Sequence, residues 1–381
     1  MTLKEVKTII IGAGPAGLAV AGRLREKRMP FEILEQANSV GVTWRNHYDR
    51  LRLHTVKKLS ALPHLPFPDH YPQYASRKQV VDYLEMYAAH FDIHPHLNTT
   101  VDKISKDGNQ WKIETQRAQT FQSEQVVIAT GVNRIPFVPT WEGQNLYEGQ
   151  ILHSRDYRNP NDISGDRVLV IGMGNTGAEL ALDLADADKK THISVRSPVS
   201  IIPRDINGRP TQLTAKMLEK FPFGIGEWLG NVVRKVVVGN LSKYGIREPK
   251  LAPAKQIKLT GKTPVLDIGT LRHIKSGKIK ILPDVDHFDS EGVVTKDGKV
   301  YQFDSVLLAT GYRAGIEQFL VNTKNLFDDY GVPKNPVGEG DYDGLYFVGF
   351  DNYKLGGILG TIRTDSELIV KDMEKRVLAG A

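Results

Sequence analysis

The 381-residue sequence contains no cysteine, and this absence excludes several kinds of chemistry. Disulfide bonds, thiolate ligands for zinc, a cysteine nucleophile and a redox-active dithiol all require that side chain. The sequence also lacks an uncharged apolar run of the roughly 18 residues that a membrane-spanning helix needs and lacks any block of like charges. We therefore expect no integral membrane segment, no nucleic-acid partner and a cytoplasmic location.

Lys and Arg number 50 against 44 Asp and Glu, so the formal net charge is +6. Because no block of like charges occurs, we expect this excess to be spread along the chain. A mild positive charge suits small anionic ligands such as dinucleotides. At about 150 residues per domain, the length predicts two or three domains.

The first glycine motif lies between an expected strand and an expected helix. Residues 7–11 form a β-branched run typical of a buried parallel strand, and Gly12-Ala-Gly14-Pro-Ala-Gly17 follows at once. Gly12 permits a tight turn, Gly14 lets the backbone approach a pyrophosphate, and Gly17 lets the helix pack closely. Glu35 lies 18 residues after Gly17, where a carboxylate binds ribose hydroxyls and would repel a 2′-phosphate. This pattern predicts FAD or NAD rather than NADP.

A second glycine motif follows the expected strand at residues 167–171 and has the opposite charge at its ribose position. The next strand ends at Arg196-Ser197, and Arg196 lies 19 positions after the last glycine. A guanidinium with a neighbouring hydroxyl suits the 2′-phosphate of NADP. We therefore assign FAD to the first motif and NADPH, with NADH as a weaker alternative, to the second. The residues expected to hold NADP are Gly172, Gly174, Asn175, Thr176, Gly177, Arg196 and Ser197.

Two Ala-Thr-Gly segments mark where the chain is expected to leave the first domain and return to it. Each follows an apolar strand, and together they contain Thr130, Gly131, Thr310, Gly311 and Tyr312. We predict an α/β protein with two Rossmann-like three-layer dinucleotide-binding domains. The expected FAD domain is discontinuous, with residues 1–159 and 296–381, and the NADP domain, residues 160–295, is inserted into it.

Two regions carry no nucleotide motif. Residues 209–262 include an apolar helical stretch, for which a packing helix or a dimer surface is the favoured interpretation and a substrate cover the alternative. A homodimer is therefore the expected assembly. His90, His94 and His96 lie close together, but we expect them to be exposed and without acidic partners, so no metal site is predicted.

The segment Tyr147-x-Gly149-x-x-x-His153-x-x-x-Tyr157 is similar to the F-x-G-x-x-x-H-x-x-x-[YF] fingerprint of one enzyme family. On this segment the chain resembles class B flavin-dependent monooxygenases of the flavin-containing monooxygenase group. Baeyer–Villiger enzymes of the same class usually carry Trp where Tyr157 stands. Residues 48–54, 261–267 and 275–280 resemble the YUCCA branch, whose members convert indole-3-pyruvate to indole-3-acetate.

The resemblance implies that NADPH reduces FAD and that O₂ then forms a C4a-hydroperoxyflavin, so the cofactors carry the chemistry. The implied reaction is oxidative decarboxylation of an aryl-pyruvate or oxygenation of soft nitrogen and sulfur nucleophiles in a small-molecule substrate. An NADPH oxidase or a flavin reductase that passes electrons to oxygen or to a protein partner is the alternative.

The residues expected to hold FAD are Gly12, Gly14, Gly17, Glu35, Gln36, Trp44, Arg45, Val101, Thr130 and Gly131. His153 and Tyr157 belong to the fingerprint linker, and we expect His153 to have a structural role. Thr310, Gly311 and Tyr312 are expected between the domains. His54 stands where many flavin-containing monooxygenases carry an Asn, which makes it the candidate catalytic residue near C4a. A histidine that satisfies backbone groups beneath FAD is the equal alternative.

Overall fold

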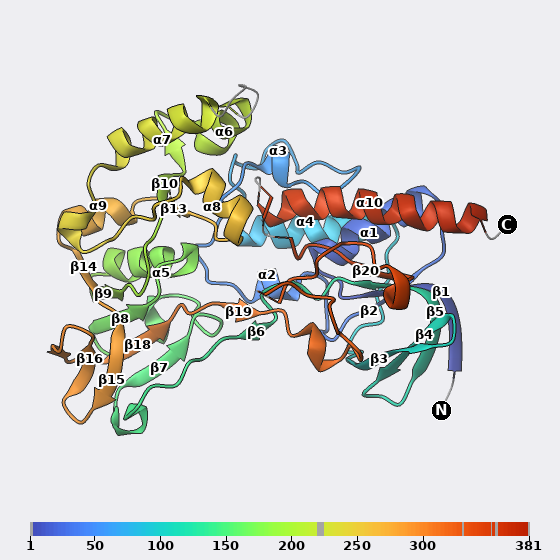
Figure 1. Cartoon of the computed structure of the whole chain (residues 1–381), viewed down its shortest axis with the longest axis horizontal. Coiled ribbons are helices and arrows are strands. Elements are labelled where there is room, and N and C mark those ends of the chain that lie inside the picture. The colour runs from blue at the N-terminus through green and yellow to red at the C-terminus, as the bar shows by residue number, and fades with distance from the viewer. Residues whose placement is uncertain (1–2, 219–224, 330, 352, 355–356, 380–381) are drawn as a thin grey trace. The chain divides into compact units, whose positions relative to one another are not determined.

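The computed structural model describes residues 3–218, 225–329, 331–351, 353–354 and 357–379, and the chain divides into two compact units (Figure 1). Unit 1 comprises Met1–Arg45, Thr55–Ile135 and Tyr312–Ala381. Unit 2 comprises Asn46–His54 and Pro136–Gly311. These limits differ from the sequence-based boundaries at 159/160 and 295/296, because strands on both sides of those positions pair within the sheet of unit 2.

Unit 1 is built on a six-stranded sheet in the order β2-β1-β5-β4-β3, in which β20 also pairs with β5. Its strands are β1 (Leu3–Ile11), β2 (Glu32–Leu34), β3 (Val101–Asp107), β4 (Gln110–Thr115), β5 (Thr120–Ile128) and β20 (Leu345–Phe347). The strands β2, β1, β5 and β20 are parallel, and β3 and β4 are antiparallel. Ile11 lies opposite Leu34 and Ile128, so the first glycine turn begins at the carboxyl edge of the parallel strands.

Three helices pack together in unit 1, and α1 (Pro15–Glu26) contacts both α10 (Ile358–Ala379) and α4 (Arg77–His90). A capping box begins α4, since the Ser76 hydroxyl accepts a hydrogen bond from the Gln79 N–H and the Gln79 side chain accepts one from the Ser76 N–H. The remaining short elements are α2 (Val42–Arg45), α3 (Lys57–Ser60), β6 (Ile135–Pro136), β19 (Tyr312–Arg313), η5 (Ile316–Gln318) and η6 (Gly340–Tyr342).

Unit 2 has three layers around a parallel sheet in the order β14-β9-β8-β18-β7. Helix α5 packs on β8 and β9, α9 packs on β14, and apolar side chains join the sheet to the antiparallel strands β15–β17. The sheet strands are β7 (Gln150–His153), β8 (Arg167–Ile171), β9 (Lys190–Ser194), β14 (Ile279–Leu282) and β18 (Ser305–Leu308). The covering elements are α5 (Asn175–Asp186), α9 (Thr270–Lys275), β15 (Val285–Asp289), β16 (Gly292–Thr295) and β17 (Val300–Tyr301).

A helical segment extends unit 2 beyond this sheet. It contains α6 (Thr211–Leu218), α7 (Ile225–Val238) and α8 (Pro253–Thr260), and in Figure 1 α6 and α7 lie on the side of α5 away from the parallel sheet. The remaining short elements of unit 2 are η1 (Gln144–Leu146), η2 (Pro160–Asp162), β10 (Ile201–Pro203), β11 (Asp205–Ile206), β12 (Arg209–Pro210), η4 (Ser242–Tyr244) and β13 (Val265–Asp267). For the apolar stretch within residues 209–262 a packing helix or a dimer surface was the expectation. Of the valines at 232–238 only Val238 is buried, so this helix does not simply pack into unit 2. Residues 219–224 lie outside the described residues.

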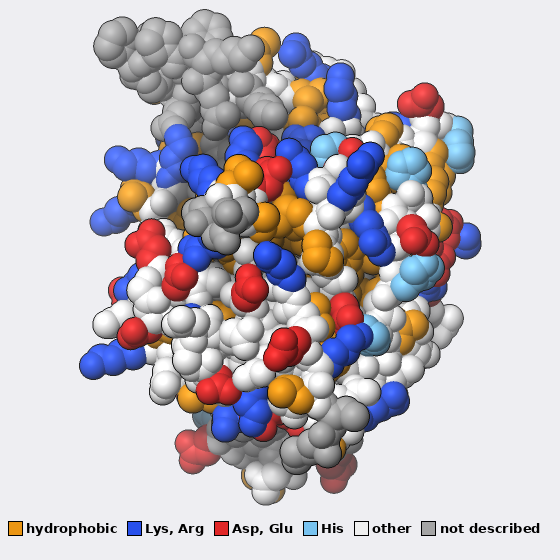
Figure 2. Space-filling view, turned by 90° about the vertical axis from the view of Figure 1, so that its right-hand side faces the viewer, with side chains coloured by type: hydrophobic (Ala, Val, Ile, Leu, Met, Phe, Trp, Pro, Cys, Tyr) orange, Lys and Arg blue, Asp and Glu red, His pale blue; other side chains and the backbone are white. Residues whose placement is uncertain are grey.

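Surface histidines and charged side chains can be compared with what the sequence predicts about metal sites and membrane segments. His94 pairs with Asp92 at 2.6 Å and His96 with Glu32 at 2.9 Å, so the expectation that these histidines lack acidic partners is wrong. Acidic and basic side chains are interspersed over much of the face in Figure 2. Within the described ranges, no helix is long and apolar enough to cross a membrane.

Candidate functional site

The first glycine turn joins β1 to α1 and leaves open space in front of the helix. Gly12 has φ +105°, and a Cβ there would lie 2.8 Å from the Ala129 carbonyl oxygen. A Cβ on Gly17 would collide with the Gly12 carbonyl oxygen, so both positions require glycine. A Cβ on Gly14 would meet nothing within 4 Å. The unpaired N–H groups at the start of α1 therefore face a space that an anion can enter.

Glu35 ties the end of β2 to this glycine turn. Its side chain is buried, with one carboxylate oxygen accepting a hydrogen bond from the Ala13 N–H at 2.6 Å and the other from the Ala37 N–H at 2.8 Å. Each oxygen keeps a second lone pair, so the carboxylate can also accept a hydrogen bond from a ribose hydroxyl. Glu35 thus has a structural role that the sequence pattern did not indicate.

A cavity in unit 1 gathers most of the residues predicted to hold FAD. Those that line it are Gly12, Gly14, Glu35, Gln36, Trp44, Val101, Thr130 and Gly131. The other two do not line it: Gly17 packs against the turn, and the Arg45 guanidinium forms an ion pair with Glu85. The Thr130 hydroxyl is buried and has no hydrogen-bond partner among the described residues, so it can bind a polar ligand atom.

Apolar residues far away in the sequence complete the same cavity. Phe319 and the first turns of α10, through Ile358, Leu359 and Ile362, form part of its lining. Sequence reasoning missed these residues because they carry no motif and lie in the last segment of unit 1. Their apolar side chains exclude water from one side of a cavity whose other side is formed by the glycine turn and Glu35.

The second glycine turn repeats the first one in unit 2. Gly172 has φ +106°, a Cβ there would lie 2.6 Å from the Ala309 carbonyl oxygen, and a Cβ on Gly177 would collide with the Gly172 carbonyl oxygen. A Cβ on Gly174 meets nothing within 4 Å, as at the first turn. The Asn175 side chain accepts a hydrogen bond from the Leu266 N–H at 2.7 Å, so it secures β13 to α5. Thr176 follows in the first turn of α5 and is half-buried.

Two arginines meet beyond the end of β9. The Arg196 side chain is exposed and Ser197 is half-buried, and the Arg247 guanidinium donates a hydrogen bond to the Arg196 carbonyl oxygen at 2.8 Å. The Arg247 carbonyl in turn accepts a hydrogen bond from the Val199 N–H at 2.9 Å. Sequence reasoning missed Arg247 because it lies 51 residues from Arg196 and belongs to no motif. The pair places two cations where a dinucleotide-binding fold holds the adenosine ribose.

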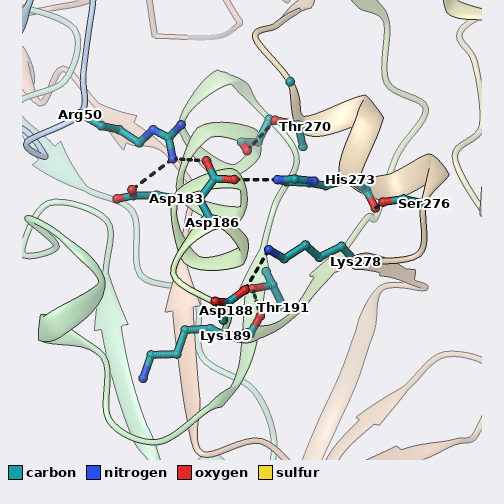
Figure 3. A network of polar contacts seen from close by, with 12 residues as sticks. Arg50, Asp183, Asp186, Asp188, Lys189, Thr191, Thr270, His273, Ser276 and Lys278 are labelled. Atoms are coloured by element: carbon teal, nitrogen blue, oxygen red, sulfur yellow. Dashed lines mark hydrogen bonds and ion pairs between the residues drawn. The ribbon is translucent and has the colours of Figure 1, made fainter.

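The segment Asn46–His54 belongs to unit 2 and is held on α5 by three carboxylates, of which Glu179 is buried. The Tyr48 hydroxyl donates to one Glu179 carboxylate oxygen at 2.9 Å, and the His54 Nε2 contacts the other. Glu179 is 2% exposed, and burial together with the nearby Glu179 charge raises the pKa of Tyr48 well above its usual value. Arg50 reaches Asp183 and Asp186 on the same helix, as Figure 3 shows. His54 thus has a carboxylate partner that sequence reasoning did not find, and its role near C4a stays a prediction.

The fingerprint residues hold the chain where it enters and leaves unit 2. The His153 Nδ1 accepts a hydrogen bond from the Arg155 N–H at 3.1 Å, and its Nε2–H donates to the Gly311 carbonyl at 3.3 Å. Burial lowers the pKa of His153, which favours this neutral form. Tyr157 is fully buried, and its hydroxyl donates to Asp183 at 2.8 Å. These contacts support a structural role for His153.

The return segment is tied to the same place. The Thr310 hydroxyl donates to the Phe137 carbonyl, and the Phe137 N–H donates to the Gly311 carbonyl at 2.9 Å. The Gly311 carbonyl therefore accepts hydrogen bonds from both the fingerprint histidine and Phe137, which directly follows β6. Tyr312 is the first residue of β19 and begins the last segment of unit 1.

Residues 5–324 match the family FMO-like, described as Flavin-binding monooxygenase-like. The chain belongs to this family. It is 41% identical over 363 residues to the protein of Arabidopsis thaliana named "Probable indole-3-pyruvate monooxygenase YUCCA3", an alignment that covers 92% of this chain and 83% of that protein. It is 38% identical over 371 residues to "Indole-3-pyruvate monooxygenase YUCCA1" of Oryza sativa subsp. japonica, covering 96% and 90%.

Solved structures of flavin monooxygenases share the fold. "Flavin-containing monooxygenase from Stenotrophomonas maltophilia" superposes with a TM-score of 0.74 at 19% identity, covering 98% of this chain and 99% of that one. "Oxidized steroid monooxygenase bound to NADP" gives a TM-score of 0.74 at 18% identity, covering 96% and 85%. The predicted α/β class with two Rossmann-like domains is confirmed, as is the resemblance to this family. As a family member, the chain is a flavin-dependent oxidoreductase.

Proposed function

We propose that this flavin-dependent oxidoreductase is an FAD monooxygenase that uses NADPH and O₂ to decarboxylate an aryl-pyruvate, with indole-3-pyruvate as the leading candidate. The observation that carries this proposal is the 41% identity, over 92% of the chain, to a relative named for indole-3-pyruvate. The structure adds a cavity for one dinucleotide and a second glycine turn with two arginines for another.

The residues of unit 1 fit FAD. The start of α1 supplies N–H groups for a pyrophosphate, Glu35 accepts from a ribose, and the unpartnered Thr130 hydroxyl offers a further polar contact. The apolar side chains of α10 exclude water from this cavity. When bound, FAD would accept the hydride from NADPH and, once reduced, react with O₂. The protein thus binds, orients and shields the cofactor, and no cysteine is needed.

The residues of unit 2 fit NADPH. The open space at Gly174 admits a pyrophosphate to the start of α5, and Arg196 and Arg247 provide positive charge for a 2′-phosphate. NADH lacks that phosphate, so we propose it as a weaker co-substrate. We also propose that the buried Glu179 carboxylate, through its contact with Nε2, fixes the orientation of the His54 imidazole ring.

A substrate panel tests the proposal. Purified protein loaded with FAD is mixed with NADPH, O₂ and one of indole-3-pyruvate, phenylpyruvate, a sulfide or a tertiary amine, and NADPH loss is followed together with product. We expect the two pyruvates to raise NADPH consumption and to give one arylacetate per NADPH. A rise only with the sulfide or the amine would instead support oxygenation of soft nucleophiles. An unchanged rate with every compound, and hydrogen peroxide equal to NADPH consumed, would overturn the proposal in favour of an NADPH oxidase.

Two finer expectations belong to the same proposal. A cytoplasmic location is proposed from the cysteine-free sequence, and subcellular fractionation tests it. A homodimer is the expected assembly, and light scattering of the purified protein measures it.

A further inference from the structure

Seven apolar side chains of α6 and α7 are exposed, and together we call them the hairpin face. The two helices contact each other in the outer part of unit 2. The exposed fractions of these side chains range from 39% to 79%, and the residues are Leu213, Met217, Trp228, Val232, Val233, Val236 and Val237. Folded proteins rarely leave apolar side chains gathered in this way unless the surface has a partner.

The exposed residues cover about half of the circumference of α7 at 3.6 residues per turn. Trp228, Val232 and Val236 follow one another at intervals of four, and Val233 and Val237 continue the same face. On the opposite side of the helix, Arg234 and Val238 are buried, at 8% and 1% exposure. Unit 2 therefore uses one side of α7 for packing and leaves the other side apolar and uncovered within the described residues.

The positive charge of the chain is concentrated in the same segment. Residues 209–262 contain eleven Lys and Arg against three Asp and Glu, a net charge of +8, whereas the whole chain has +6. The remaining residues thus sum to −2. The expectation that the excess is spread along the chain is wrong, because cations placed singly, every few residues, do not appear as a block.

Among the described side chains of this segment, every cation except Arg234 is exposed. Glu248 is the one acid among them, and it pairs with the buried Arg234 at 2.9 Å. Eight cationic residues are exposed, namely Arg209, Lys235, Lys243, Arg247, Lys250, Lys255, Lys258 and Lys262. An apolar helical face within a strongly basic segment suits a partner that is both apolar and negatively charged.

We propose that the hairpin face binds the surface of an anionic lipid bilayer. A second copy of the chain fits less well, because a two-fold contact through this face would bring the two basic segments together. A bilayer offers acyl chains to the valines, an interfacial layer suited to Trp228, and anionic headgroups to the lysines. Helix α7 has 14 residues, about 21 Å of helix, so it lies in the membrane plane and does not cross the bilayer.

Vesicle flotation tests this proposal with FAD-loaded full-length protein. We expect the protein to float with vesicles of phosphatidylcholine and phosphatidylglycerol and to remain unbound with phosphatidylcholine alone, and we expect 0.5 M NaCl to weaken binding. The double variant Trp228→Ser/Val236→Ser should bind at least tenfold more weakly, and Lys235→Glu/Lys243→Glu should lose the preference for the anionic lipid. The matched control Val138→Ser/Leu146→Ser changes two other exposed apolar residues of unit 2 and should bind like the unmodified protein.

Flavin absorbance and basal NADPH oxidation establish that each variant is folded, since none of these substitutions touches the cavity or a glycine turn. Equal flotation of the unmodified protein and the Trp228→Ser/Val236→Ser variant would overturn the proposal, as would no flotation with anionic vesicles. Light scattering tests whether a second copy of the chain, and not a bilayer, covers the hairpin face. A dimer that becomes a monomer in this variant would assign the hairpin face to a second copy of the chain.

Discussion

A guanidinium held by a backbone carbonyl is already oriented before it meets a phosphate, so less side-chain entropy is lost on binding. Arg247 is held in this way by the carbonyl of Arg196, beside the strand end that we propose distinguishes NADPH from NADH. We expect Arg247→Ala to raise the KM for NADPH about tenfold, as the loss of one charge-assisted contact does, and to leave the KM for NADH unchanged. Steady-state kinetics with both cofactors measure this difference.

The control for this prediction lies on the same segment. Lys250 is also exposed and cationic, and Lys250→Ala should leave both KM values unchanged. If Arg247→Ala raised the KM for NADPH and for NADH by the same factor, Arg247 would stabilise the loop and would not recognise the 2′-phosphate.

His153 gives the protein a residue-level dependence on pH. Its pKa in the folded protein is lowered by burial from about 6.5, the usual value in an unfolded chain. The folded state therefore binds fewer protons than the unfolded state once the pH falls below that value, and stability falls toward acid. The variant His153→Gln keeps an N–H donor for the Gly311 carbonyl but cannot titrate. We expect its Tm to fall less than that of the unmodified protein when the pH is lowered from 7.5 to 5.5.

Differential scanning calorimetry at the two pH values measures this change in slope. The exposed His90 at the end of α4 provides the control, and His90→Gln should keep the slope of the unmodified protein. An identical slope for His153→Gln would show that protonation of His153 does not couple to folding.

Residues that belong to a local motif were predictable, and residues that act through distant contacts were not. Gly12, Gly14 and Glu35 could be assigned because a strand, a tight turn and a ribose contact fix their spacing. Arg247 and Glu179 could not, since their partners lie 51 and 125 residues away and only tertiary packing brings them together.

At the scale of elements, α5 serves two purposes. Its first turn carries the second glycine motif, and one face carries three carboxylates, Glu179, Asp183 and Asp186, at helical spacing. These side chains bind Tyr48, Arg50 and Tyr157, and Asp186 also binds His273 at 2.7 Å (Figure 3). The helix whose N-terminus we propose for a dinucleotide thus also holds three other segments of unit 2.

The energetic contribution of this face can be measured by substitution. Leaving a buried group without its hydrogen-bond partner costs about 1–3 kcal/mol. Glu179 has two side-chain partners, so we expect Glu179→Ala to lower the free energy of unfolding by about 2–5 kcal/mol. Tyr48→Phe removes one hydrogen bond and should cost about 1 kcal/mol. Urea unfolding of the full-length protein, followed by circular dichroism, provides both values.

Asp188 is the matched control for these variants. It lies two residues after the end of α5, but its side chain is exposed and pairs with Lys278 at 3.0 Å. Surface pairs contribute about 0–1 kcal/mol, so Asp188→Asn should unfold like the unmodified protein. A Glu179→Ala variant as stable as Asp188→Asn would mean that Tyr48 and His54 do not depend on that carboxylate.

Elements were predictable where their pattern was periodic, and their surroundings were not. The capping box at Ser76 and the strand before each glycine turn follow from local sequence alone. The apolar run at 232–238 is helical as predicted, but composition could not show that half of this helix is exposed. An apolar sequence reports the chemistry of a face and does not report whether anything covers it.

At the scale of the whole molecule, each glycine turn lies in a different compact unit. A ligand that binds only the folded state stabilises it by about 2.7 kcal/mol at 100 times its Kd. We therefore expect FAD to protect residues 11–18 and 126–131 from hydrogen exchange, and NADP⁺ to protect residues 171–178 and 194–199. Exchange measured by mass spectrometry, on protein with neither, one or both cofactors, resolves the two units.

Two alanine variants separate cofactor binding from folding in this experiment. A Cβ on Gly14 or on Gly174 meets no protein atom within 4 Å, and neither residue has a positive φ, so both variants should fold normally. The added methyl group enters the space proposed for a pyrophosphate, so Gly14→Ala should abolish protection by FAD alone and Gly174→Ala protection by NADP⁺ alone. If NADP⁺ still protected residues 171–178 in Gly174→Ala, or if it protected the turn at Gly14, the assignment of the two dinucleotides to the two units would be wrong.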